Sequence, residues 1–470
     1  MFDGLDALDD AGLLATMAES VRTERAAVAR RMVSLGLLTQ RRLVDADPDS
    51  EFQCIDDWEA LAAEVGAELG ITRGRASGEM SHGETLVTRL PALAQRFLAG
   101  EVDVRVITTI DFRTALVQDP ELLARLDAML ADQAPGWNKL SKKKLVGVID
   151  WLVTDLDPEA QRITADRRAD RCVEISPDPH QPGMAQLWGR LPAADGATLD
   201  ERLDAVAATV CGEDPRTKAQ RRADALIAVS EGATTLACGC GNESCAAGGA
   251  ASQSSQIVVH VLAEQSTVTG ASATPGYVPG YGPIPAESVR EVAKKAKLRP
   301  LIVPTDVAPE PHYRPSAALA EFVRNRDLTC RWEGCDVLAE HCDLDHTIPY
   351  PHGPTHPSNV KCYCRVHHLV KTFLSGLGGW SERQHPDGTM TFRSPSGRIY
   401  TTKPGGALFF PQLATPTGAL IIPEQPPPTN AHRALKMPRR TRTRAAARAA
   451  RIESERALRR ADTEANPPPF

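Results

Sequence analysis

Cysteine and histidine side chains are concentrated in residues 330–371, in a pattern that predicts metal binding. A C-x4-C pair is followed, after 28 residues, by a C-x2-H pair. Together they supply the four sulfur and nitrogen donors of a tetrahedral zinc site, and the metal would close the long loop between them. Two further thiols, those of Cys342 and Cys362, could replace one of these ligands. The expected ligands of this structural zinc site are Cys330, Cys335, Cys364 and His367.

A second set of side chains in the same segment has the types that hydrolyse phosphodiesters. Asp345 and His368 are the expected ligands of a divalent ion such as Mg²⁺ or Mn²⁺, which keeps open positions for a phosphate. The imidazole of His346 titrates in the range needed to take a proton from the attacking water. The amide of Asn359 would brace either the loop or that imidazole. The candidate phosphate-binding residues are Arg365 and Lys371.

These side chains need a strand, a loop and a helix to bring them together. If residues 365–371 are helical, His367 and His368 project about 100° apart, so that one faces the zinc site and the other the second site. Lys371 follows His368 by three residues and lies on the same face of that helix. A strand carrying the Asp-His pair, a loop ending in Asn359 and this helix predict a compact ββα unit.

The same residues resemble an HNH endonuclease motif. The resemblance rests on DH at 345–346, GPTHPSN at 353–359 and CRVHHLVK at 364–371. It implies a ββα-metal fold and metal-dependent cleavage of DNA. Zinc-bearing members of that family usually show two C-x2-C pairs, whereas this chain has a C-x4-C pair and a final histidine. That departure concerns the identity of the zinc ligands rather than the presence of the motif.

The wider chain resembles the mycobacterial thirteen-E-twelve repeat proteins and related actinobacterial proteins, over most of residues 1–410. The stretches that carry this resemblance are LDERLDAVAATVCGEDPRTKAQRRADAL (199–226), VVHVLAEQ (258–265) and HCDLDHTIPYPHGPTHPSN (341–359). These proteins join an N-terminal domain of unknown function to a C-terminal HNH nuclease. The resemblance supplies no role for the N-terminal half.

We therefore predict an HNH endonuclease, a hydrolase that cuts or nicks DNA with water activated by His346. The alternative is a non-catalytic zinc-containing module of a mobile element, which binds nucleic acid or a protein and keeps the Asp-His pair as a remnant. No Gly-rich phosphate loop accompanies a βαβ pattern, which argues against an ATP-driven motor within this chain.

Hydrophobic periodicity predicts a mainly α fold with a small β component. Apolar residues recur every three or four positions from Leu5 to about Asp166. A strand pair is expected at RCVEIS and MAQLWGRL, followed by a helix capped by Thr198 and a helix at DPRTKAQRRADALIAV. The β-branched run at 257–264 predicts a buried strand. The expected domains are a mainly helical domain at 1–290, an HNH module at 315–375, a β meander at 376–410, and a proline-rich linker with a disordered basic tail at 411–470.

Charge is distributed unevenly along the chain, although the formal net charge is only −6. Residues 1–70 hold 15 acidic and 6 basic side chains, whereas residues 433–460 hold 11 Lys or Arg and 2 Glu. A basic segment of this kind either binds a polyanion such as DNA through counterion release or forms a solvated helix face. The N-terminal helical domain is in addition a candidate for homo-oligomerisation.

The start of the chain and its hydropathy argue against export. Residues 1–10 carry four aspartates and no basic residue, whereas a signal peptide begins with positive charge. No window approaches the roughly 18 apolar residues of a membrane span. We therefore expect a cytoplasmic protein with no membrane partner, in which the eleven cysteines are reduced or bind metal.

A second group of thiols lies at Cys238, Cys240 and Cys245, in a Gly- and Ser-rich stretch. His260 could complete a zinc site with them. Three ligands with an unidentified fourth form a weak pattern, so the sequence slightly favours a flexible loop with spare thiols.

Overall fold

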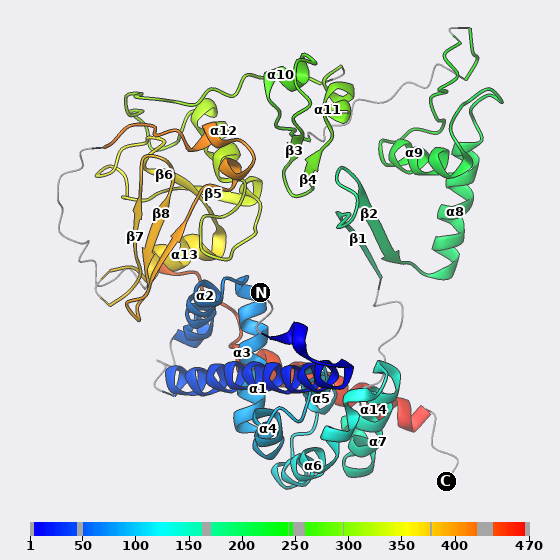
Figure 1. Cartoon of the computed structure of the whole chain (residues 1–470), viewed down its shortest axis with the longest axis vertical. Helices are drawn as coiled ribbons and strands as arrows, with labels where there is room; N and C mark the ends of the chain where they lie inside the picture. Colours follow the sequence, from blue (N-terminus) through cyan, green and yellow to red (C-terminus); the bar gives the residue numbers. More distant parts are fainter. Residues whose placement is uncertain are drawn as a thin grey trace. The chain divides into compact units, whose positions relative to one another are not determined.

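The computed structural model describes residues 4–44, 50–161, 171–242, 244–247, 259–294, 296–376, 378–420 and 436–465 (Figure 1). The chain divides into two compact units. The first unit combines Met1–Ile163 with Leu301–Phe470, and the second is Thr164–Pro300. A single domain over 1–290 is therefore not the observed division, because a boundary lies after residue 163. Overall the fold is mainly helical with small antiparallel sheets, as predicted.

The N-terminal part of the first unit is a bundle of helices around one apolar core. Six of its seven helices begin with an Asp, Ser or Thr whose side chain accepts a backbone N–H of the first turn, which satisfies a donor that the helix leaves open. Phe97, Ile110 and Leu130 are fully buried in the core. The helices are α1 (Asp10–Leu43), α2 (Asp57–Leu69), α3 (Arg73–Thr88), α4 (Pro91–Leu98), α5 (Val104–Thr114), α6 (Pro120–Gln133) and α7 (Lys142–Leu156).

Two glycines allow α1 and α3 to pack with their backbones in contact. A Cβ on Gly83 would lie 2.4 Å from the Met32 carbonyl oxygen and 2.7 Å from the Gly36 nitrogen. A Cβ on Gly36 would lie 2.2 Å from the Gly83 carbonyl oxygen. All three distances are too short for any side chain, so this helix crossing requires glycine at both positions.

We expect Gly83→Ala to lower the free energy of unfolding of the first unit by about 1–3 kcal/mol, since overpacking outweighs the gain in helix propensity. Gly78→Ala is the matched control on the same helix, because a Cβ at Gly78 meets nothing within 4 Å. The control should raise the free energy of unfolding by up to about 1 kcal/mol. Chemical denaturation of both variants measures the difference, and equal effects would contradict the close approach.

The C-terminal part of the first unit contains the candidate site. A helix leads into an antiparallel strand pair, a second helix and a three-stranded meander with strand order β7-β8-β9. In the strand pair, Cys342 lies opposite Cys364 and Asp345 opposite Lys361. The predicted helix, ββα order and meander are all present at these places. The elements are α12 (Ala317–Asp327), β5 (Cys342–His346), β6 (Val360–Cys364), α13 (Arg365–Phe373), β7 (Ser381–Gln384), β8 (Met390–Arg393) and β9 (Ile399–Thr402).

The second unit differs from the expectation in two places. The first of its two longer helices begins at Ala193 after Pro192, so Thr198 lies inside the helix and does not cap it. Among the described residues of the expected strand at 257–264, only Leu262 pairs, in an isolated bridge to Tyr277. Val259 is 70% exposed rather than buried. The elements are β1 (Cys172–Pro177), β2 (Ala185–Arg190), α8 (Ala193–Ala207), α9 (Lys218–Ser230), α10 (Gln265–Val268), β3 (Gly276–Val278), β4 (Gly282–Ile284) and α11 (Ala286–Ala293).

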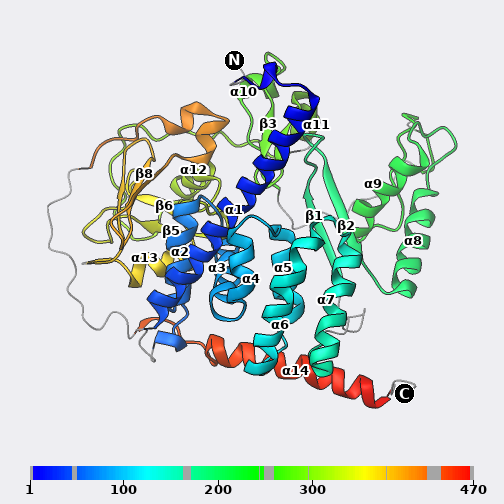
Figure 2. The same ribbon diagram turned by 60° about the horizontal axis from the view of Figure 1, so that its bottom comes forward.

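The basic tail corrects the expectation of disorder for residues 436–465. Helix α14 (Arg444–Ala465) lies along the helical bundle of the first unit (Figure 2). Arg444 pairs with Asp56, and Arg456 pairs with Asp157 at 2.9 Å. Acidic side chains of the N-terminal part therefore hold the basic helix. In the described residues, no helix is both long and apolar enough to cross a membrane.

Candidate active site

The four expected zinc ligands come together where β6 runs into α13. Their ligand atoms all lie within 4.8 Å of one another. Cys364 is the N-cap residue of α13, and its N–H donates to Cys330 Sγ at 3.3 Å. His367 Nδ1 lies 3.5 Å from Cys330 Sγ and 3.3 Å from Cys364 Sγ. Because the donors of a tetrahedral zinc site are about 3.3–3.8 Å apart, this cluster could hold a metal ion such as zinc.

Aromatic side chains enclose this cluster. Trp332 stacks on His367 with ring centroids 4.8 Å apart and 2° between the planes, and Trp380 packs edge-on against Trp332. The two alternative thiols are outside this set, although burial and the nearby Cys342 both raise the pKa of the Cys330 thiol. Cys342 Sγ contacts the Val337 carbonyl, and Cys362 is buried with its sulfur near the Val323 carbonyl. Neither belongs to the grouped ligands.

We expect Cys364→Ser to lower the zinc content by one equivalent per chain and to destabilise the C-terminal part of the first unit, which loses its metal ligand set. Cys362→Ser is the matched control, since Cys362 is buried on the same strand as Cys364 but lies outside the cluster. Elemental analysis and thermal unfolding measure both effects. Zinc retained in Cys364→Ser, or lost equally in the control, would contradict this ligand set.

A buried network of charges surrounds Asp345. Its Oδ2 accepts from Lys361 Nζ at 2.8 Å and from Lys371 Nζ at 2.7 Å. Lys361 also pairs with Glu382 of β7 at 2.8 Å, which ties the strand pair to the meander. Burial alone would raise the pKa of Asp345, but the two ammonium groups outweigh burial and lower it to about 2. Asp345 is therefore a carboxylate at neutral pH.

His368 faces the other oxygen of this carboxylate. Its Nδ1 lies 2.9 Å from Asp343 Oδ2, and its Nε2 lies 3.4 Å from Asp345 Oδ1. The Asp343 carboxylate fixes the ring so that Nε2 can present a lone pair. Two donors that are each about 2.1 Å from a shared ion lie about 3.0–3.4 Å apart. Asp345 and His368 thus have the chemistry and spacing to hold one divalent ion.

His346 is positioned by a hydroxyl and an aromatic ring. Its Nε2 lies 2.8 Å from Thr355 Oγ1, and the Thr355 hydroxyl donates to the His312 carbonyl at 2.5 Å. Because the hydroxyl proton is engaged there, Nε2 carries the proton and Nδ1 keeps the lone pair. Tyr313 stacks on the imidazole, with ring centroids 5.3 Å apart. Burial lowers the pKa of His346, so the ring is neutral at neutral pH.

Asn359 braces the loop between the two strands. Its Oδ1 accepts from the Ile348 N–H at 2.9 Å, and its Nδ2 donates to the carbonyls of Ile348 and Pro354. Gly353 lets the backbone approach, since a Cβ there would lie 2.6 Å from Asn359 Nδ2. Of the two roles considered for Asn359, these bonds correspond to support of the loop.

The two candidate phosphate-binding residues have different surroundings. Arg365 is exposed on the first turn of α13 and pairs with Asp343 at 3.2 Å. Lys371 is largely buried, and its Nζ contacts Asp345 and the His346 carbonyl. Burial and the neighbouring Lys361 lower the pKa of Lys371. Only Arg365 reaches into solvent without rearrangement.

Sequence reasoning missed the residues that surround these groups. Asp343 shares a strand face with Asp345 because side chains two apart on a strand point the same way, and this periodicity could have revealed it. Lys361 follows from the register of the strand pair. No sequence signal points to Glu382, which reaches the network from the meander.

A family model described as a domain of unknown function, DUF222, matches residues 19–327. The chain belongs to the DUF222 family. The DUF222 match spans most of the helical bundle, the whole second unit and α12, and ends before β5. The candidate active site therefore lies outside the part that the DUF222 model describes.

Several mycobacterial proteins are similar to this DUF222 chain. The uncharacterized proteins Rv3776 and Rv2100 of Mycobacterium tuberculosis are each 45% identical to it, over 87% and 86% of this chain and 82% and 79% of their own lengths. An uncharacterized protein in the est 3′ region of the same organism is 42% identical over 67% of this chain and 96% of its own. No solved structure matches. The mycobacterial resemblance is confirmed, while the HNH function stays a prediction.

Proposed function

We propose that this protein is a metal-dependent DNA endonuclease of the HNH type. The observation that carries the proposal is the buried His346, whose Nε2 contacts Thr355 Oγ1 and which directly follows the carboxylate that pairs with His368. A general base needs a neutral imidazole, and a divalent ion needs this donor pair. The order β5, β6, α13 further supports an HNH-like unit.

Each side chain has a distinct task in this proposal. His346 takes a proton from water at Nδ1, while Thr355 holds the opposite edge of the ring. Asp345 and His368 bind the divalent ion, Mg²⁺ or Mn²⁺, and Asp343 orients His368. When bound, that ion stabilises negative charge on the phosphate and on the leaving 3′ oxygen. The Cys330 cluster binds zinc that holds β6 and α13 in place.

Binding of DNA through phosphate contacts is part of the same proposal. The residues available for these contacts are fewer than the sequence predicted. Arg365 is available in solvent, whereas Lys371 first has to leave Asp345. Many tail arginines, among them Arg444 and Arg456, already pair with acidic side chains of the helical bundle. We therefore assign the tail a smaller share of DNA binding than its composition indicates, with affinity that falls as salt rises.

We expect His346→Ala to lower the rate of metal-dependent nicking of supercoiled plasmid DNA about 10²–10⁴-fold, the usual contribution of a general base. His352→Ala is the matched control, because His352 is exposed in the loop after β5. The control should cut as the natural chain does. Assays with Mg²⁺, Mn²⁺ and no added metal, together with zinc content, separate lost chemistry from lost structure.

The nuclease proposal would be overturned if the natural chain binds zinc and shifts DNA in a gel but cleaves none of three substrates. These are supercoiled, branched and single-stranded DNA. The lysine contacts on Asp345 give this alternative a structural basis, because they occupy one oxygen of the proposed ligand. The non-catalytic zinc module would then be the better description.

We expect Lys371→Met to bind Mn²⁺ roughly tenfold more tightly, equivalent to about 1.4 kcal/mol, because Asp345 loses one of two competing ammonium groups. The same variant should cut DNA more slowly at saturating metal, since it lacks the phosphate contact. Lys403→Met, at an exposed position of the same unit, is the control. A Mn²⁺ titration followed by electron paramagnetic resonance measures affinity, and an unchanged affinity would contradict Asp345 as ligand.

A further inference from the structure

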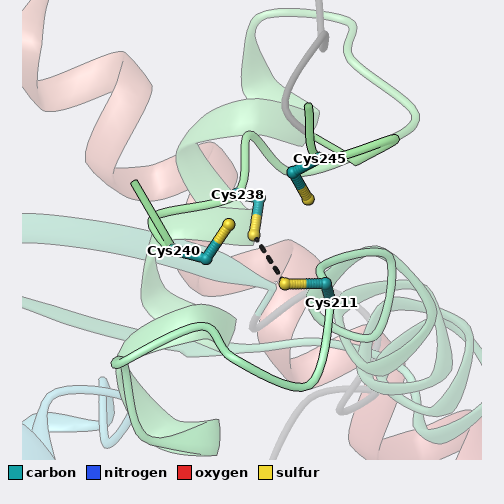
Figure 3. A group of neighbouring side chains, drawn as sticks. All are labelled: Cys211, Cys238, Cys240 and Cys245. Atoms are coloured by element: carbon teal, nitrogen blue, oxygen red, sulfur yellow. Dashed lines mark hydrogen bonds between the residues drawn. The ribbon is translucent and has the colours of Figure 1, made fainter. Parts of the chain in front are cut away.

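Four thiols meet in the second unit, and one of them comes from a distant part of the sequence. Cys211 follows α8, whereas Cys238, Cys240 and Cys245 follow α9. Their sulfur atoms all lie within 4.8 Å of one another. Figure 3 shows the four side chains converging on the space between these two segments. His260, the fourth ligand considered from sequence, is exposed and is not part of this group.

The spacing of these sulfurs fits a metal better than a disulfide. Cys211 Sγ and Cys238 Sγ are 3.4 Å apart, and all four thiols are free. A disulfide requires about 2.05 Å. Sulfurs that are each about 2.3 Å from a tetrahedral zinc ion lie about 3.8 Å apart, within the limit that the cluster shows.

Hydrogen bonds of the Asp214 and Arg216 side chains hold the two cysteine-bearing segments together. The Gly239 N–H donates to Asp214 Oδ2 at 2.7 Å, so the turn between Cys238 and Cys240 is attached to the loop that contains Cys211. Arg216 bonds both Asp214 and the Ala237 carbonyl, each at 2.7 Å. These hydrogen bonds therefore bring the thiols together independently of a metal ion.

The apolar core beside these thiols is small. Its buried members are Val206, Ala207, Ala225 and Leu236. Few large side chains stabilise the packing of α8 on α9. A metal ion bound by residues that follow both helices would stabilise this packing further.

We propose that Cys211, Cys238, Cys240 and Cys245 bind one zinc ion as a tetrathiolate site, distinct from the Cys330 cluster of the other unit. Four protein ligands leave no open position, so the role of this zinc is structural. It joins the loop after α8 to the segment after α9. The proposal is independent of the nuclease function, because it concerns a different unit and predicts no chemistry.

Zinc stoichiometry of the full chain tests this site. We expect two zinc ions per chain in the natural protein and one in the Cys238→Ser/Cys240→Ser variant. Cys172→Ser, a thiol on β1 of the same unit that lies outside the cluster, is the control and should keep two. One zinc in the natural protein that only Cys364→Ser removes, or two in the double variant, would overturn the proposal.

Alkylation of the natural chain gives a second readout that needs no variant. We expect iodoacetamide to modify Cys172 before the four clustered thiols, and a zinc chelator to remove their protection, as resolved by peptide mass spectrometry. Thiols that react as fast as Cys172 before chelation would overturn the proposal. So would a disulfide that lowers the mass by about 2 Da, or iron with visible absorbance in place of zinc.

Discussion

Both parts of the candidate site depend on the junction where β6 ends and α13 begins. Cys364 occupies the N-cap position of the helix and belongs to the Cys330 cluster, while His367 in the first turn completes that cluster. His368, one residue further, points instead toward Asp343 and Asp345. Since neighbouring helical side chains differ by about 100° in direction, the geometry of this one turn fixes both ligand sets together. In the proposed function, a structural metal bound at this turn would position His368 without contacting it.

The grouping of Cys330, Cys335, Cys364 and His367 was predictable because these residues are closely spaced pairs of types that commonly bind metals. The supporting groups were harder to predict, since their roles come from strand register and from other elements. Lys361 matters because it lies opposite Asp345, and Glu382 matters because the meander packs against that pair. Cys211 precedes its partner Cys238 by 27 residues, so local spacing gave no sign that a fourth thiol was available.

In the fold as well, features that depend on nearby residues were predictable, whereas features that depend on distant residues were not. Helices with regular apolar spacing were predictable. In the β-branched run at 257–264, Leu262 is the only described residue that pairs, because strand pairing, not residue type alone, decides whether a strand forms. Ion pairs within the chain explain part of its uneven charge distribution. Arg444 and Arg456 of α14 meet Asp56 and Asp157 of the helical bundle, so the acidic and basic segments neutralise each other within one unit.

The insertion of the second unit into the first affects the order of events during synthesis. Thr164–Pro300 is continuous, so this unit can fold as soon as it leaves the ribosome. The first unit needs α14, whose arginines bond side chains about 300 residues earlier. The acidic side chains of its N-terminal helices therefore lack their arginine partners until α14 has been synthesised. The first unit is therefore completed only after both cysteine clusters have been synthesised.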